Sequence, residues 1–218
     1  MDRIEMRPIK EMTTYDVLVV GGGTSGMMAA ISAAEHGAKV AVIEKNSTLG
    51  RKLLVTGGGR CNVTNNRDKE EIIAHIPGNG RFLYSAFYQY DNYDIMDFFR
   101  SNGVTLKEED HGRMFPITDK SRTILEALSG IMDRLEVDIY TAAPVDTLLF
   151  DEGKVTGVQL QDGRNLHASC VIVSTGGKAM PRTGSTGDGY KWAKKAGHTI
   201  TPLYPTESPI LSDESFIK

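Results

Sequence analysis

The sequence feature that most constrains the fold is a glycine-rich turn that joins an apolar run to a helical pattern. The run Val17–Val20 leads directly into Gly21-Gly22-Gly23-Thr24-Ser25-Gly26, which has Gly-x-Gly-x-x-Gly spacing. A second apolar stretch, from Lys39, ends on Glu44. A strand, a glycine turn, a helix, a second strand and a terminal acid within about 30 residues predict a βαβ unit that binds a dinucleotide.

Each position of this turn meets a separate physical requirement. Gly21 allows a sharp turn out of the strand, Gly23 lets backbone N–H groups approach a pyrophosphate, and Gly26 lets the helix pack closely on the sheet. The pyrophosphate is expected at the helix N-terminus, where unpaired N–H donors stabilise negative charge. Glu44 falls where ribose hydroxyls can donate to its carboxylate. The alternative is a glycine turn that binds no nucleotide, and the full pattern argues against it.

The composition is that of a soluble globular protein, with 40% hydrophobic and 24% charged residues among 218. The formal net charge of −3 gives no basic field for nucleic acid, and no basic run suggests a membrane surface. Residues 1–14, which we take as an N-terminal extension, lack the apolar stretch of a secretory signal, and no segment is long enough to span a bilayer. We expect a cytoplasmic protein that acts on a small-molecule substrate.

Metal and disulfide sites are not indicated. Cys61 and Cys170 are the only cysteines, and the five histidines lie singly without the i, i+4 spacing of a zinc helix. We expect Cys170 to be a small apolar core residue of a buried strand over 170–175.

Hydrophobic periodicity predicts the elements that follow the βαβ unit. The stretch from about 68 to 103 is predicted to be helical, and we expect its aromatic side chains, among them Phe82 and Tyr90, to pack in the core. A hairpin is predicted over 104–116. Thr118 or Asp119 can cap the amphipathic helix that comes next.

A strand over 137–140 and three short antiparallel strands over about 144–168 complete the pattern, before the strand at 170–175. The fold class is therefore α/β. We expect a Rossmann-like domain over 15–200, with a parallel sheet and helices on both faces, plus a small antiparallel β-meander.

A second glycine-rich segment, Thr56-Gly57-Gly58-Gly59-Arg60-Cys61-Asn62, follows the βαβ unit. Glycine costs conformational entropy, so consecutive glycines in a compact domain mark a place where the backbone approaches something closely. A flat ring system fits that requirement. A flexible surface loop is the alternative, and the apolar Leu53-Leu54-Val55 that precedes the segment argues against it.

Taken together, these residues resemble the glutathione-reductase-like FAD fold in its two-dinucleotide-fold-flavoprotein form. Within it, the chain is similar to the bacterial family of NAD(FAD)-utilizing dehydrogenases or aminoacetone-oxidase-like flavoproteins, to which a bile-acid reductase is also assigned. The motifs that carry the resemblance are Gly50–Asn65, Gly112–Pro116 with Asp119-Lys120, and Pro181–Tyr190. Family members are nearly twice as long, so the resemblance implies an N-terminal portion. Residues 201–218 would then lead into a substrate-side domain, and the remaining portion of the protein is a candidate partner.

The resemblance implies FAD as cofactor and assigns places to individual residues. The glycine turn would meet the pyrophosphate, Glu44 the adenosine ribose, and Val145 the adenine through its backbone. Arg51 and Lys52 would follow the ribityl and phosphate path, and the segment from Thr56 to Asn62 would pass beside the isoalloxazine. The full set of implied cofactor residues is Gly21, Gly23, Thr24, Ser25, Gly26, Glu44, Lys45, Gly50, Arg51, Lys52, Thr56, Gly57, Gly58, Gly59, Asn62, Val145, Thr175, Gly176 and Asp188.

The leading hypothesis is an FAD-dependent oxidoreductase in which the flavin accepts a hydride and passes it to an organic acceptor or to oxygen. NAD(P)H is a candidate donor that would react directly at the flavin, because the sequence contains no second Gly-x-Gly-x-x-Gly. Two alternatives stay open: an NAD-dependent dehydrogenase in which Glu44 selects NAD, and a catalytically silent dinucleotide-binding fragment.

No residue has a clear acid or base role. Arg60, Arg113 and Asp188 are the best candidates for polar groups near the reacting face, and their alternative role is to hold loop structure. Cys61 has no neighbouring cysteine to form a redox disulfide, so we expect it to pack or to tune the flavin.

Overall fold

The computed structural model describes residues 13–205, and residues 1–12 and 206–218 lie outside the described part of the chain. The predicted N-terminal extension, 1–14, and the predicted final segment, 201–218, therefore lie largely outside it. Thr14, which the prediction placed in the extension, already belongs to the first strand. Among residues 13–205, no helix combines the length and the apolar character needed to cross a membrane.

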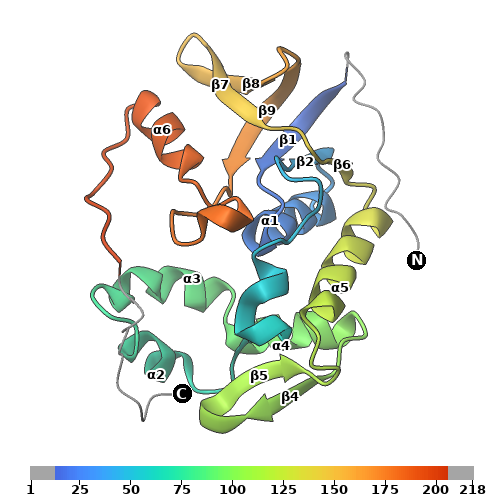
Figure 1. Ribbon diagram of the computed structural model, residues 1–218, viewed down its shortest axis with the longest axis vertical. Helices are drawn as coiled ribbons and strands as arrows, with labels where there is room; N and C mark the ends of the chain where they lie inside the picture. Colours follow the sequence, from blue (N-terminus) through green and yellow to red (C-terminus); the bar gives the residue numbers. More distant parts are fainter. Residues whose placement is uncertain (1–12, 206–218) are drawn as a thin grey trace, which may run out of the picture.

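A six-stranded sheet forms the upper part of the molecule in Figure 1, in the order β6-β2-β1-β9-β8-β7. The first four are parallel: β1 (Thr14–Val20), β2 (Val40–Ile43), β6 (Asp138–Tyr140) and β9 (Asn165–Val173). In register, Val20 pairs with Ile43 on one side and with Val173 on the other, so β1, β2 and β9 end level. All four residues of β2 are buried, which explains its uninterrupted apolar run.

The predicted meander is confirmed as β7 (Val145–Asp151), β8 (Lys154–Leu160) and the first part of β9. The sequence predicted separate strands at 165–167 and 170–175, but β9 is continuous. It pairs antiparallel with β8 as far as His167, and from His167 onward it pairs parallel with β1. Cys170, predicted to be a core residue, is exposed. The pairing with β8 ends at His167, so Cys170 lies in the part of β9 that has β1 as its paired neighbour, beyond the meander.

Helices lie on both faces of the sheet, as predicted. On one face, α1 (Thr24–Glu35) and α5 (Ser121–Arg134) contribute Met27 and Leu128 to a continuous apolar core. On the other face, α6 (Asp188–Lys195) and the meander enclose a second core that contains Leu18 and Trp192. The Trp192 indole N–H donates to the Asp146 carbonyl oxygen at 2.9 Å, which fixes α6 to the meander.

The segment predicted to be helical, about 68–103, contains four short elements. They are α2 (Lys69–Ala74), the 3-10 helix η2 (Gly80–Leu83), α3 (Tyr84–Gln89) and α4 (Asn92–Ser101). Asp91 breaks the segment because it forms a capping box with Asp94 that starts a new helix.

The core packing expected for the aromatic residues of this segment is wrong for several of them. Phe82 is 79% exposed, and Tyr84, Tyr88, Tyr90 and Tyr93 are also exposed. The predicted stripe assumed one helical axis through Phe82 and Tyr90, and the breaks between the short helices remove that axis.

A small three-stranded antiparallel sheet lies beside α4 and α5, in the order β3-β5-β4. The predicted hairpin is confirmed as β4 (Leu106–Glu109) and β5 (Arg113–Pro116), joined by the 3-10 turn η3 (Asp110–Gly112). The third strand, β3 (Thr64–Asn65), was not predicted. It directly follows the second glycine-rich segment, which lies within the 3-10 element η1 (Leu53–Gly59) and its continuation.

Neither Thr118 nor Asp119 caps α5, contrary to the prediction. The N-cap residue is Lys120, and no side chain caps the helix. Asp119 has a φ of 53°, and its carboxylate accepts a hydrogen bond from Lys107 at 2.7 Å. The Asp119 side chain therefore bonds to Lys107 of β4, in the small sheet, and not to the N-terminus of α5.

Candidate functional site

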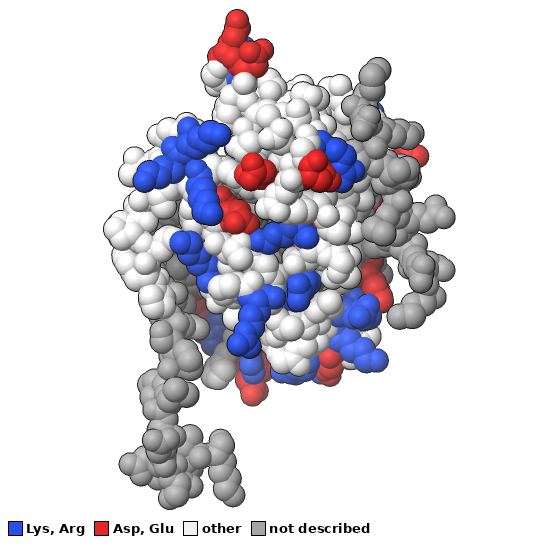
Figure 2. All heavy atoms as spheres, turned by 45° about the horizontal axis from the view of Figure 1, so that its top comes forward, with Lys and Arg blue, Asp and Glu red and all other residues white. Residues whose placement is uncertain are grey.

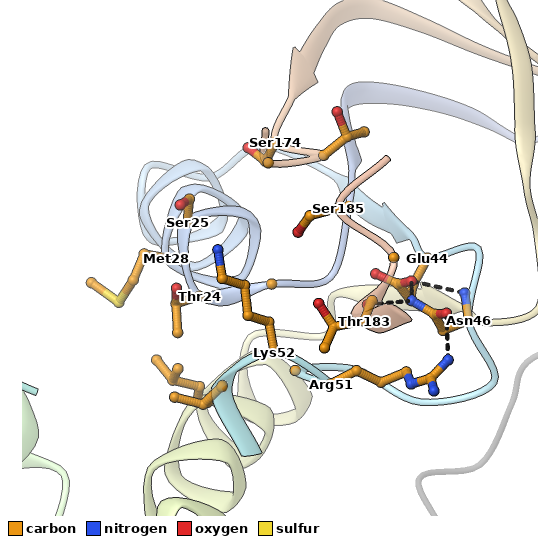
Figure 3. Close-up of a pocket in the computed structure, with 18 of the residues that line it drawn as sticks. Thr24, Ser25, Met28, Glu44, Asn46, Arg51, Lys52, Ser174, Thr183 and Ser185 are labelled. Carbon is orange, nitrogen blue, oxygen red and sulfur yellow. Dashed lines mark hydrogen bonds between the residues drawn. The ribbon is translucent and has the colours of Figure 1, made fainter. Parts of the chain in front are cut away.

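A cavity of about 570 Å³ opens at the carboxyl ends of β1, β2 and β9, which lie at the same level in the sheet. Its walls come from the glycine turn, the residues after β2, the element η1 and the segment that follows β9. Ligands of open α/β sheets bind at this edge, and the volume lies within the range of small-molecule sites. Figure 3 shows side chains from these separate segments around one space, with Thr24 and Ser25 on one side and Glu44 and Asn46 on another.

The glycine turn contains two kinds of glycine. A Cβ on Gly21 would lie 2.5 Å from the Ser174 carbonyl oxygen, and one on Gly26 would overlap the Gly21 carbonyl oxygen. A Cβ on Gly22 would overlap the Leu49 side chain. Gly21 and Gly26 need glycine because backbone atoms fill the space, whereas at Gly22 the Leu49 side chain would have to move. Gly23 differs, because a Cβ there would have no protein atom within 4 Å.

The turn presents unpaired donors to the cavity. The Gly21 N–H donates to the Ile43 carbonyl oxygen at 2.8 Å, and the Gly22 N–H donates to Glu44. The N–H groups of Gly23, Thr24 and Ser25 have no acceptor among residues 13–205, as expected for the first turn of a helix. In Figure 3 the Lys52 side chain extends toward this turn. Free N–H donors at a helix N-terminus favour a bound anion.

Glu44 is buried at the end of β2, and both of its carboxylate oxygens are engaged. Oε2 accepts the Gly22 N–H at 2.7 Å, while Oε1 accepts the Asn46 backbone N–H at 2.8 Å and its side-chain amide at 2.6 Å. A carboxylate oxygen can accept more than one hydrogen bond, so Oε2 has capacity left for a ligand hydroxyl. The carboxylate is therefore oriented before any ligand arrives.

Asn46 is a site residue that the sequence reasoning missed. Besides its bonds to Glu44, its side-chain oxygen accepts a hydrogen bond from Arg51 at 3.0 Å, and its amide reaches the Thr183 carbonyl oxygen at 3.4 Å. A polar residue just after the carboxyl end of a parallel strand was the available signal. Asn46 links Glu44, Arg51 and the segment after β9 into one wall.

Asp188, expected near the flavin, lies beside Lys45 in the structure. Lys45 Nζ is 2.7 Å from Asp188 Oδ2 and 2.6 Å from the Thr186 hydroxyl. Burial opposes ionisation of Asp188, but the Lys45 ammonium and the Thr186 hydroxyl hold its pKa below the ordinary value. This contact holds the segment after β9 against the residue that follows Glu44.

The second glycine-rich segment contributes its ends to the cavity, and its three glycines do not line it. Thr56, Cys61 and Asn62 do so, whereas Gly57, Gly58 and Gly59 have φ values of 54°, 66° and 86° and form the bend between them. Cys61 is 5% exposed, and burial raises the pKa of its thiol, although a hydrogen bond with Thr56 works in the opposite direction. A neutral buried thiol fits the expected packing role.

The two candidate arginines lie outside the cavity lining. Arg60 Nη1 contacts both carboxylate oxygens of Glu109, at 2.9 and 3.0 Å, and its guanidinium stacks on the Phe115 ring at 4.3 Å. The Arg113 guanidinium lies 5.7 Å from the same ring, and its Nε donates to the Asp110 carbonyl oxygen. Both arginines hold loop structure, which is the alternative that the sequence left open.

The cavity brings together most of the predicted cofactor residues. Those that line it are Gly21, Gly23, Thr24, Ser25, Glu44, Lys45, Gly50, Arg51, Lys52, Thr56, Asn62, Val145, Thr175, Gly176 and Asp188. Gly26 instead supports the turn from behind. Lining residues that the sequence did not single out include Thr183 and Ser185, and also Ile95 and Phe99 at the end near α4.

Charge is unevenly distributed over the face that carries α6. Figure 2 shows one group of Lys and Arg side chains at the upper left and others across the centre and lower right of this face, with Asp and Glu between them. The helix itself carries Lys191, Lys194 and Lys195. Their ammonium groups add positive charge near the part of the cavity that Asp188 and Trp192 of the same helix line. No group of three or more His, Cys, Asp or Glu side chains suited to a metal ion occurs among the described residues.

Comparison with known proteins gives a family and several relatives. The model of the family described as HI0933-like protein Rossmann domain matches residues 15–206. A 3-dehydro-bile acid delta(4,6)-reductase of Clostridium scindens is 35% identical over 190 residues, which are 86% of this chain and 45% of that protein. A ribosomal RNA dihydrouridine synthase of Escherichia coli is 30% identical over 192 residues, 88% of this chain and 46% of that one. The chain spans less than half the length of these relatives.

Solved structures with a similar fold include a flavocytochrome c3 fumarate reductase in its open conformation, with a TM-score of 0.61 and 22% identity over 85% of this chain and 41% of that one. Sdh1 of Mycobacterium smegmatis in complex with UQ1 has a TM-score of 0.66 and 20% identity over 84% of this chain and 38% of that one. At such identities the likeness extends to the fold alone, and it agrees with the predicted Rossmann-like α/β class.

Proposed function

The chain belongs to the HI0933-like protein Rossmann domain family, and from that premise we propose that it is the FAD-binding portion of an FAD-dependent oxidoreductase. The observation that carries the proposal is Gly23, where the protein leaves open the space that a Cβ would take. Gly21, Gly22 and Gly26 are explained by protein contacts. Gly23 is explained by a ligand that comes close to the backbone, at the same place as three unpaired N–H groups.

The residues present fit a dinucleotide. In our proposal the N–H groups of Gly23 to Ser25 and the Lys52 ammonium hold the pyrophosphate, and the oriented Glu44 carboxylate accepts from the adenosine ribose. Val145, at the start of β7, is the residue proposed beside the adenine. Arg51, Thr175 and Gly176 line the path between the ends, and Thr56 and Asn62 lie on the side proposed for the isoalloxazine.

FAD, when bound, supplies a ring that accepts and releases a hydride. The work of this chain is to bind and orient it: free amides and Lys52 neutralise phosphate charge, Glu44 fixes the ribose, and buried apolar residues such as Phe99 keep water from one end of the cavity. No side chain of the described residues is assigned as acid or base. NAD(P)H as electron donor is part of the proposal and rests on the family resemblance.

An NAD-dependent dehydrogenase is the second candidate, and the observation that favours it is Glu44 itself. An acid at the end of the second strand suits the ribose of NAD as well as that of FAD. What supports FAD is the extent of the cavity, which continues past the glycine turn to Thr56 and Asn62. A dinucleotide-binding fragment without catalytic activity remains the third reading.

Titration of the purified chain with FAD and, separately, with NAD separates these candidates. We expect FAD to raise the melting temperature, because a ligand at 100 times its Kd stabilises the folded state by about 2.7 kcal/mol. We also expect the fluorescence of FAD to change on binding. NADH oxidation by the FAD-loaded chain would distinguish an enzyme from a silent fragment. A chain stabilised by NAD and unaffected by FAD would refute the proposal.

For the substrate we propose a small apolar molecule and not RNA. The two relatives named above differ in this respect, since one is named as a bile acid reductase and the other as a ribosomal RNA dihydrouridine synthase. The cavity end near α4 is lined by apolar side chains, among them Met28, Ile95 and Phe99, and the whole chain has a net charge of −3. Binding of ribosomal RNA fragments measured against binding of a steroid-like enone tests this. RNA binding that weakens steeply with salt, without any effect of the enone on the flavin spectrum, would contradict it.

A further inference from the structure

Four charged side chains form a cluster behind the second glycine-rich segment: Arg60, Lys107, Glu109 and Asp119. Lys107 Nζ lies 2.7 Å from Asp119 Oδ2 and 3.2 Å from Glu109 Oε1. Arg60 Nη1 contacts both oxygens of Glu109 and lies 3.5 Å from Asp119 Oδ1. Asp119 Oδ1 is buried without a hydrogen-bond partner among the described residues, and the charge of the carboxylate is compensated by the Lys107 ammonium at Oδ2 and by the Arg60 guanidinium near Oδ1.

The cluster joins the small sheet to the cavity wall. Glu109 ends β4, Asp119 follows β5, and Arg60 directly follows the three glycines. Phe115, on β5, is 2% exposed and packs between these parts: the Arg60 guanidinium covers its ring, and its edge faces Gly57, where an added Cβ would lie 3.4 Å away. Arg60 is therefore held by charge on one side and by an aromatic ring on another.

Two backbone hydrogen bonds also close the segment: the Arg60 N–H donates to the Gly57 carbonyl oxygen at 3.3 Å, and the Cys61 N–H donates to the Thr56 carbonyl oxygen at 3.2 Å. Gly57, Gly58 and Gly59 have left-handed φ values and no side chains to pack, so the Arg60 side chain is the nearest side-chain attachment on this side of the bend. Immediately after Arg60 come Cys61 and Asn62, which line the cavity. Any movement of Arg60 is passed directly to these two residues through the backbone.

We propose that Arg60 is a positioning residue: its attachment to Glu109 and Asp119 sets where Cys61 and Asn62 lie in the cavity wall. Arg60, Glu109 and Asp119 themselves stay outside the cavity. The effect on flavin binding rests on the proposed function, whereas the effect on the position of Cys61 does not. The two can therefore be measured separately.

The test uses the Cys61 thiol as a reporter in a Cys170→Ser background, which removes the exposed cysteine. Alkylation of Cys61 is followed at one pH, without flavin, in Arg60→Gln, Arg60→Lys, Glu109→Gln and Asp119→Asn variants. Glu109→Gln and Asp119→Asn keep shape and remove charge, and asparagine also tolerates the left-handed backbone at position 119. The matched control is Arg100→Lys, because Arg100 pairs with Asp97 on the exposed side of α4, away from the cluster.

We expect alkylation at least about tenfold faster in Arg60→Gln, Glu109→Gln and Asp119→Asn, a smaller increase in Arg60→Lys, and no change in the control. A tenfold change corresponds to about 1.4 kcal/mol in the opening equilibrium. Unchanged alkylation in variants that melt as the wild type does would overturn the proposal. Alkylation that rises in parallel with global unfolding in all variants would also overturn it, because the cluster would then stabilise the whole fold and not this wall.

A second measurement addresses the flavin. If FAD binds, the same three variants should shift its visible absorption band and weaken its binding, and the control should not. Faster alkylation with no FAD binding in any protein, wild type included, would refute the proposed function while leaving the positioning role of Arg60 standing. FAD binding with identical absorption bands in all variants would refute the proposal that Arg60 positions Cys61 and Asn62 beside the flavin.

Discussion

The variant Gly23→Ala tests whether glycine is needed at position 23 for ligand binding or for folding. Gly23 has a φ of −80° and a ψ of −178°, which alanine adopts freely, and the new methyl group would meet no protein atom within 4 Å. Reduced entropy of the unfolded chain stabilises by about 0.4–1 kcal/mol, and the poorer capping by alanine costs about as much. The free energy of unfolding should therefore change by less than about 1 kcal/mol.

Binding should respond far more strongly. The methyl group would stand where a phosphate approaches the N–H groups of Gly23, Thr24 and Ser25, so the phosphate must retreat. Hydrogen bonds to charged groups contribute about 1.5–3 kcal/mol each, and weakening two of them would cost about 3 kcal/mol or more. At about 1.4 kcal/mol per factor of ten, the Kd for FAD should rise at least about 100-fold.

The assay is a titration with FAD, followed by flavin fluorescence, together with a melting curve of each protein. Gly130→Ala is the matched control, because it makes the same change inside α5, where the added Cβ comes no closer than 4.0 Å to the Arg134 side chain. It should bind FAD normally and gain up to about 1 kcal/mol of stability. A folded Gly23→Ala protein whose Kd stays within about threefold of the wild type would show that no phosphate lies at this turn.

Further changes probe other parts of the site and core. Gly26→Ala should prevent stable folding, since its methyl would overlap the Gly21 carbonyl, and a soluble variant with a normal melting curve would contradict this. Leu128→Ala, at 1% exposure, should lower the free energy of unfolding in urea by about 2–5 kcal/mol. Glu44→Gln places an amide N–H opposite the N–H donor of Gly22 or of Asn46, so one hydrogen bond is lost. We expect the free energy of unfolding to fall by about 1–3 kcal/mol and FAD binding to weaken. A variant as stable as the wild type would argue against both contacts. Asp188→Asn should lower the melting temperature at neutral pH and not in strong acid. Its pKa is depressed, so the stabilisation exists above the unfolded pKa of about 3.9 and is lost as pH falls through the folded value.

The glycine turn and the Glu44 strand could be predicted because their physics is local: a few adjacent residues fix the turn, the helix start and the strand end. The Lys45–Asp188 and Arg60–Glu109 contacts could not, since their partners are 143 and 49 residues apart in sequence and only the folded chain brings them together. The aromatic residues were misplaced for a different reason, which is that one capping residue, Asp91, interrupts an apparently continuous helical period.

The sequence predicted which residues belong to the site, and the structure added the contacts that place them. Asn46 was missed because no glycine or charge marks it, yet it bonds to Glu44, Arg51 and Thr183. Arg60 stood out in the sequence beside three glycines, but its side chain turns to Glu109, since the bend at Gly57–Gly59 points the residue away from the cavity that its neighbours line.

The continuity of β9 limits how this family can vary in sequence. Because the strand pairs with β8 at one end and β1 at the other, adding or deleting one residue between 165 and 173 would reverse its side chains at one end. Either Leu166 would leave the core of the meander, or Val173 would lose its alignment with Val20. Changes of length are far easier to absorb in the tight turns at Glu152-Gly153 and Asp162-Gly163. We therefore expect insertions among relatives to collect at these turns, while β9 keeps a constant length.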